Sequence, residues 1–473
     1  MSKTGKFADL FVRKEVNTDM FKKTGLDKTL SAFSLTTMGV GAIVGAGIFI
    51  TPGIIAASYS GPGVWLSYLV AAVVCSLAAL CYSEFSSTIP LAGSAYTYIY
   101  AVFGELIAWI LGWALISEYL FAVSSVAVSW SAYFQNILAG FNIHLPAIFR
   151  AAYGTAGSPR ALFDLPAFLI TMIIAYLLVQ GVRESAKVNA VMVILKIAVI
   201  VLFIVVAAFY IRPANYSPML PFGAKGVIRG AAVAFYAYIG FDAVSTASEE
   251  VKNPKRDMPI GIVSSLIVAS VLYILLSVVL VGVVHYTKLN VADPVAFALH
   301  FIHQNWVAGI VSLGAVVGMT TVLIVMLYGG TRLIFAISRD GLLPSALHKL
   351  NPQTHVPTIN TWALGFIASV FAGIIPLTKI AELVNIGTLF AFAMVSLGVV
   401  FLPKDRRFRD LPKSFEVPFY PVIPIISFLA CIYLMLQLAS FTWMMFGIWL
   451  VIGLIVYFGY GFSHSHARQN EEK

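Results

Sequence analysis

Long apolar runs follow one another along the whole 473-residue chain, separated by short segments rich in proline, glycine and charge. A helix that crosses a bilayer needs about 20 mainly apolar residues, and most of the runs reach that length. The pattern therefore predicts twelve membrane-spanning helices. They cover residues 30–57, 63–87, 104–136, 161–181, 188–210, 226–250, 260–284, 306–337, 358–375, 380–402, 420–438 and 441–462. Residues 94–103 are an ambiguous segment, which either stands alone or extends the third helix.

The composition agrees with this pattern, because 60% of the residues are apolar and only 11% are charged. In soluble proteins roughly a quarter of the residues are charged, so an ordinary soluble protein is excluded. No long polar insert interrupts the runs, which predicts a single all-α integral membrane unit without a separate enzyme domain. Three cysteines, at positions 75, 81 and 431, lie within apolar runs and form neither a zinc spacing nor a disulfide framework.

The distribution of Lys and Arg predicts the orientation in the membrane. With the N-terminus inside, 22 of the 30 basic residues fall on the cytosolic side and seven on the other side, while Lys196 lies within a span. Basic loops stay in the cytosol, so both termini are expected there, as a basic segment 1–29 and a short segment 463–473. The net charge of +9 thus fits a multi-pass protein of the cell membrane, with the lipid bilayer and not nucleic acid as partner.

Glycines cluster inside the first span, at positions 39, 41, 45 and 47. Glycine costs up to about 1 kcal/mol relative to alanine in a helix, so the cluster indicates broken helix or very close packing. The spacing does not fit a dinucleotide-binding loop. A helix-packing motif, Gly41-x-x-x-Gly45, remains an equal alternative at this point.

The sixth span contains a second interruption, where Gly240 and Asp242 lie in mid-helix. Interrupted helices at corresponding places indicate two inverted five-helix repeats with a substrate site between them. The repeats would be residues 30–210 and 226–402, with helices eleven and twelve within 403–462. Free N–H groups after a break attract an anion and free carbonyls attract a cation, so such a site suits a zwitterion such as an α-amino acid.

Several motifs resemble those of the amino acid-polyamine-organocation (APC) superfamily, and within it the bacterial ApcT-like members of the cationic amino acid transporter (CAT) family. The most specific is FYAYIGFDAVSTASEEVKNPKRDMP at 235–259, supported by GAGIF at 45–49, PLAGSAY at 90–96 and SRDGLLP at 338–344. The resemblance implies the five-plus-five inverted repeat of the LeuT-like fold with helices 1 and 6 broken. It also implies secondary transport of amino acids by alternating access.

The resemblance further implies a substrate site made by the two breaks. Backbone N–H groups of Ala46 and Gly47 would bind the substrate carboxylate, and carbonyls of Ile43, Tyr236 and Ile239 would bind its amino group. Either Tyr236 or Phe235 would cap the substrate. The full set of expected substrate-binding residues is Ile43, Val44, Gly45, Ala46, Gly47, Phe235, Tyr236 and Ile239.

Lys196 lies about nine residues into the fifth span, too deep for its ammonium group to reach water easily. It either exchanges a proton during transport or serves as a fixed counter-ion. The pattern Gly181-Val182-x-x-Ser185-Ala186-x-x-Asn189 before it resembles the fifth helix of ApcT-type transporters, whose lysine occupies the place of a coupling sodium ion. The resemblance therefore implies proton coupling without a metal or other cofactor. It also places the hydroxyls of Thr320 and Thr321 nearby, although threonines in membranes commonly bond to their own helix.

Two acidic residues complete the expected coupling set. Glu118 lies deep in the third span and is a proton carrier, a partner for a cationic substrate or a structural acid. Asp242 matches an acid that follows the sixth-helix break in the family, where it organises the gate or the proton route.

Other functional classes lack their motifs. The chain has no paired aspartate motif of a membrane protease, no His-Glu-x-x-His, no Walker sequence and no repeated channel filter, so we expect no enzyme and no ATP-driven pump. The favoured function is proton-coupled import of small neutral L-amino acids such as alanine. Transport or exchange of arginine and lysine is the alternative, followed by an amino acid-sensing receptor, and the sequence leaves oligomeric state and any small membrane subunit open.

Overall fold

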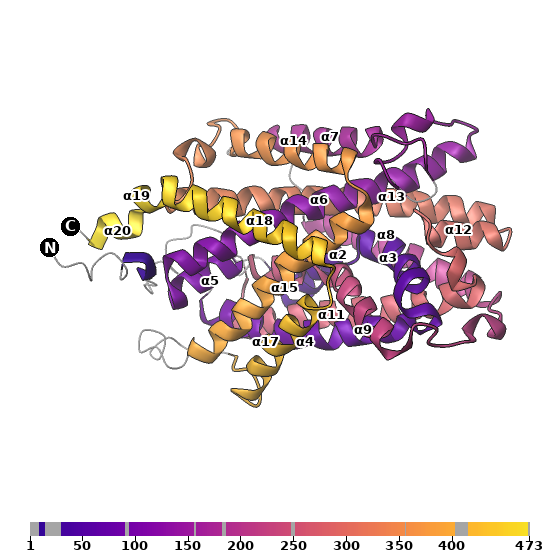
Figure 1. Ribbon diagram of the computed structural model, residues 1–473, viewed down its shortest axis with the longest axis horizontal. Helices are drawn as coiled ribbons and strands as arrows, with labels where there is room; N and C mark the ends of the chain where they lie inside the picture. The colour runs from indigo at the N-terminus through magenta and orange to yellow at the C-terminus, as the bar shows by residue number, and fades with distance from the viewer. Residues whose placement is uncertain are drawn as a thin grey trace.

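A computed structural model describes residues 9–14, 30–89, 94–155, 158–181, 186–246, 251–354, 356–402 and 415–471. In these ranges the chain is an elongated bundle of roughly parallel and antiparallel helices, with no strand beyond one isolated bridge between Leu30 and Val251. Residues 9–14 and 466–471, the first and last parts of the chain that the structure describes, lie at the same end of the bundle, called the terminal end below (Figure 1).

The first expected span is interrupted where the glycines cluster. Helix α2 (Ala32–Ile43) stops at Val44–Gly45, and α3 (Ala46–Ile55) continues beyond them. A π-helical turn at Ala56–Ser60 and a short turn at Gly61–Gly63 then lead into α4 (Val64–Thr88). Gly45 adopts φ −125° and ψ −138°, which ends the α-helical geometry between the two halves.

The sixth expected span is interrupted as well. Helix α9 (Gly223–Ala234) tightens into a 3₁₀ turn, η7, at Phe235–Tyr238, and α10 (Phe241–Thr246) resumes after Ile239–Gly240. Gly240 has a φ of +115°, a conformation that a residue with a side chain adopts only under strain. The second break therefore depends on glycine directly.

Most of the remaining helices follow the expected spans closely, but the short helices at Pro294–Phe301, Phe462–His464 and His466–Glu471 were not predicted. The remaining helices are α6 (Glu105–Gly140), α7 (Leu165–Val179), α8 (Ala186–Ala208), α11 (Pro254–Val283), α12 (Pro294–Phe301), α13 (Asn305–Arg339), α14 (Thr358–Ile374), α15 (Leu377–Phe401), α17 (Val422–Met435), α18 (Ser440–Val456), α19 (Phe462–His464) and α20 (His466–Glu471).

Residues 94–103 are a separate helix, α5 (Ser94–Phe103), and do not extend the third span. Gly104 separates α5 from α6 with a φ of +91°, and the backbone of Phe11 occupies the space where a side chain would project. Glycine at this position therefore permits both the sharp turn and the close approach of the N-terminal segment.

Seven helices in the described ranges are long and apolar enough to cross a membrane, counting Ala46–Thr88 as one. Four further apolar helices have 10–17 residues, α2 among them. A helix or an interrupted helix occupies each of the twelve expected ranges. That all twelve cross the bilayer stays a prediction, as does the division into inverted repeats.

Candidate substrate and proton-coupling site

The two breaks lie against each other in the middle of the bundle. A Cβ atom built on Gly47 would lie 2.6 Å from the Cα of Ala237, and one built on Gly240 would lie 3.0 Å from the backbone of Ala42. Residues 42–47 and 237–240 therefore meet backbone to backbone. The sequence-derived substrate-binding residues of the two helices are thus brought together.

The first turn of α3 presents free donors at this junction. The initial N–H groups of an α-helix have no partners within the helix, and no side chain caps α3. The N–H of Gly45 is used, because it donates to the Ile43 carbonyl at 2.8 Å. The next N–H groups, those of Ala46 and Gly47, carry the positive end of the helix dipole and suit a carboxylate.

Tyr273, on α11, joins the two breaks. Its hydroxyl lies 2.7 Å from the Ile43 carbonyl and 2.6 Å from the Ala237 carbonyl, so its one hydrogen can be donated to either. The Ile43 carbonyl expected to bind the substrate amino group is thus already in contact with a donor. This role of Tyr273 was not predictable, because nothing in the local sequence pattern distinguishes it from the other buried tyrosines.

The two aromatic candidates for the cap differ in their surroundings. Phe235 is completely buried, and its ring packs against Phe392 of α15 with centroids 5.5 Å apart. Tyr236 instead reaches from the break to α6, where its hydroxyl hydrogen-bonds with Ser125 at 2.8 Å. Tyr236 therefore bridges the second break and α6, whereas Phe235 packs into the core.

Lys196 is 1% exposed and lies between α2 and α13. Its ammonium nitrogen donates to the Gly41 carbonyl at 3.0 Å, three residues before the first break. On the other side, Gly318 of α13 leaves room for its stem, since a Cβ there would lie 2.9 Å from Lys196 Cγ. The lysine expected deep in the fifth span thus contacts the interrupted first helix directly.

Thr320 and Thr321 have different hydrogen-bond partners. Thr321 donates to the Gly318 carbonyl at 2.8 Å, on the turn of α13 that packs against Lys196. Thr320 donates to the Val316 carbonyl at 2.8 Å and accepts from Trp130 Nε1 of α6 at 3.0 Å. Both hydroxyls are thus bonded to their own helix, and only Thr321 lies beside the lysine.

Glu118 and Asp242 form a second buried group. They are 3% and 4% exposed, and their carboxyl groups are close enough to repel each other when both are ionised. Among the described residues, Glu118 Oε2 and the hydroxyl of Tyr82 have no hydrogen-bond partner, and Tyr82 lies within electrostatic range of both acids. The interior of the bundle thus holds a second group of ionisable side chains besides Lys196.

A cavity of about 470 Å³ lies at the end opposite the termini. Ile50 and Ile54 of α3 line it, together with Asn136 near the end of α6 and residues 290–293 before α12. Ile50 is about one helical turn beyond the break. The cavity therefore borders α3 beyond the first break.

Replacing Tyr273 with Phe tests the role of the hydroxyl at the junction. Losing a buried hydrogen bond while leaving its acceptors in place costs about 1–3 kcal/mol, so we expect a lower melting temperature of the purified protein in detergent. Tyr433→Phe is the matched control, because that ring is 53% exposed on α17. Equal melting temperatures for the two variants would contradict the role given to Tyr273.

An apolar helical bundle with two backbone breaks meeting at its centre, a buried lysine on one of them and buried acids beside the other, defines a membrane transport protein. The chain matches the amino acid permease family over residues 30–458. It belongs to this family of the APC superfamily.

Individual relatives differ in their named substrates. The chain is 49% identical to the methylthioribose transporter of Bacillus subtilis, covering 97% of this chain and 99% of the relative. It is also 49% identical to the branched-chain amino acid permease BcaP of the same organism, covering 94% and 95%. Cationic amino acid transporter 4 of Arabidopsis thaliana, a vacuolar protein, is 37% identical over 82% of this chain and 66% of its own length.

Proposed function

We propose that this permease is a proton-coupled symporter that imports small neutral L-amino acids by alternating access. The observation that carries the proposal is the contact of the Lys196 ammonium with the Gly41 carbonyl, 3.0 Å away and three residues before the break. A positive charge at this place stabilises the carbonyl end of α2. Proton loss from the lysine would remove the positive charge and weaken that interaction, which couples protonation to the geometry of the break.

The proposal includes the orientation and the repeats. The terminal end faces the cytosol, the cavity of about 470 Å³ opens to the outside, and residues 30–210 and 226–402 form inverted repeats with a substrate site at the two breaks. The proton is the coupling ion, and no other cofactor is required. Glu118 and Asp242 supply a second buried site that can hold a proton.

An apolar surrounding supports a neutral substrate. Val322 of α13 lies beside the first break, 3.2 Å from where a Cβ on Gly45 would be, and Met319 nearby is completely buried. A guanidinium would need a carboxylate in reach, and only Glu118 is a candidate for that role. Branched-chain amino acids are the second candidate class, because a 49% identical relative is named for them. Cationic amino acids are the next candidate class, because less similar relatives are named for them. A role as an amino acid sensor comes after these.

The test is uptake of labelled L-alanine into proteoliposomes with an inward proton gradient or an inward sodium gradient. We expect accumulation above equilibrium with protons alone, and competition by unlabelled leucine but not by arginine or methylthioribose. Accumulation with sodium only would overturn proton coupling. Competition by arginine or methylthioribose alone would overturn the neutral amino acid as substrate.

A further inference from the structure

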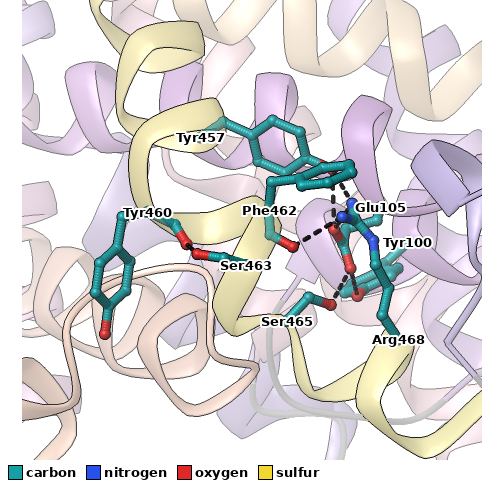
Figure 2. Close-up of polar contacts among 8 residues, drawn as sticks. All are labelled: Tyr100, Glu105, Tyr457, Tyr460, Phe462, Ser463, Ser465 and Arg468. Atoms are coloured by element: carbon teal, nitrogen blue, oxygen red, sulfur yellow. Dashed lines mark hydrogen bonds and ion pairs between the residues drawn. The ribbon is translucent and has the colours of Figure 1, made fainter. Parts of the chain in front are cut away.

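A buried carboxylate ties the C-terminal segment to the bundle at the terminal end (Figure 2). Glu105, the first residue of α6, is completely buried. It accepts hydrogen bonds from Tyr100 and Tyr457, both at 2.9 Å, from Ser465, and from Arg468 at 2.5 Å. Three of these four donors belong to the chain beyond α18.

Arg468, on α20, is held on several sides. Its guanidinium donates to the Phe462 carbonyl at 2.8 Å and to the Tyr457 hydroxyl at 2.6 Å, and it lies 3.7 Å from the centre of the Phe462 ring. Its side chain is 11% exposed and that of Glu105 is not exposed at all. Removing one partner of such a pair leaves a buried, uncompensated charge. Separating Arg468 from Glu105 while either stays buried is therefore energetically costly.

The same segment also reaches the end of α13. The N–H of His466 donates to the Asp340 carbonyl at 3.2 Å, and Gly341 has no space for a side chain because the His464 carbonyl lies against it. The ends of α6 and α13 are thus fixed to one short stretch of chain.

The same ends of α6 and α13 also bind residues 12–14 of the N-terminal segment. The Asp340 carboxylate accepts from Lys14 through both oxygens at 2.8 Å, and the N–H of Glu105 donates to the Val12 carbonyl at 2.9 Å. In the sequence, Lys14 precedes α2, the first half of the broken helix. Residues that bind the C-terminal segment and residues that bind the N-terminal segment are therefore the same.

We propose that residues 462–471 are a strap that keeps the terminal end of this permease closed. The strap fixes the ends of α6 and α13 around residues 11–14, and its release is what frees the N-terminal segment and α2 to move. The proposal rests on the alternating-access function proposed above. It concerns only the closure of one end, which can be measured without transport.

The test measures how easily a buried position behind the strap is reached from water. Ser245, on α10, is completely buried, and α10 contacts both α2 and α5. In a background with Cys75, Cys81 and Cys431 replaced by Ala, Ser245→Cys becomes the reporter. Its rate of modification by a membrane-impermeant maleimide is measured in nanodiscs, where both faces of the protein are accessible.

Arg468→Ala is expected to raise the modification rate at position 245 about tenfold. A tenfold change corresponds to about 1.4 kcal/mol, which is less than the cost of breaking a buried ion pair. Arg468→Lys should give a smaller increase, because it keeps the charge but not the planar fork. Ser463→Ala is the matched control: its hydroxyl bonds to the Tyr460 carbonyl at 2.9 Å within its own segment and points away from Glu105 (Figure 2).

An unchanged rate in folded Arg468→Ala would overturn the strap, and so would an equal increase in Ser463→Ala. If Arg468→Ala is not recovered as a folded protein, Tyr457→Phe replaces it, because it removes one donor to Glu105 and keeps the ring. An unchanged rate in Tyr457→Phe would then overturn the proposal. No arm depends on proton coupling, so failure of the strap and failure of the proposed function are distinguishable.

Discussion

Lys196→Ala is expected to abolish accumulation of amino acid against its gradient while leaving substrate binding in place. A gradient of one pH unit supplies about 1.4 kcal/mol per proton, which supports about tenfold accumulation when one proton accompanies each substrate. The variant lacks the proton-binding group that contacts the Gly41 carbonyl, so the proton gradient can no longer act on the first helix. Uptake should then stop at about equal concentrations inside and outside.

The measurement is labelled L-alanine uptake into proteoliposomes with an imposed pH gradient, paired with the shift in melting temperature caused by added alanine. The shift shows that the variant still binds substrate. Lys225→Ala is the control, because Lys225 is an exposed lysine on α9. If Lys196→Ala accumulates alanine like the control, the lysine is a fixed counter-ion and coupling occurs elsewhere.

Gly47→Ala is expected to eliminate transport and to lower the yield of folded protein. A methyl group there would lie 2.6 Å from the Cα of Ala237, a backbone atom that cannot move aside without separating the two breaks. Overpacking of this kind costs about 1–3 kcal/mol, and the displacement falls on the proposed substrate site. Uptake and the elution profile in detergent, measured on the same preparation, report the two effects.

Gly309→Ala is the matched control for Gly47→Ala. It lies within α13, and a Cβ there meets nothing within 4 Å. Alanine is favoured over glycine in a helix by about 1 kcal/mol, so this variant should transport normally and melt at the same or a higher temperature. Normal transport by Gly47→Ala would show that the two breaks are not packed as tightly as the structure has them.

The two breaks were predictable from the sequence because glycine leaves a clear mark in an apolar run. Gly45 lies at the interruption of the first span, and Gly240 has the positive φ that requires glycine in the sixth. Gly45 is also closely packed, since a Cβ built on it would lie 3.2 Å from Val322 of α13. A broken helix and close packing are therefore compatible here.

Contacts between distant segments were not predictable. Arg468 and Glu105 are 363 positions apart, and each alone resembles an ordinary charge near a helix end. Tyr273 joins two carbonyls that only the folded bundle brings together. Local patterns report burial and helix ends, whereas these contacts depend on which helices become neighbours.

The interruption at Val44–Gly45 leaves α2 as a stiff rod of 12 residues, about 18 Å long. A rod pivoting at one end is a lever, and a tilt of about 20° would carry its far end about 6 Å sideways at this length. The second rod, α3, can meanwhile stay in place with its N–H groups still facing the junction. A movement large enough to pass an amino acid thus needs no change in helical structure, only rotation about two residues.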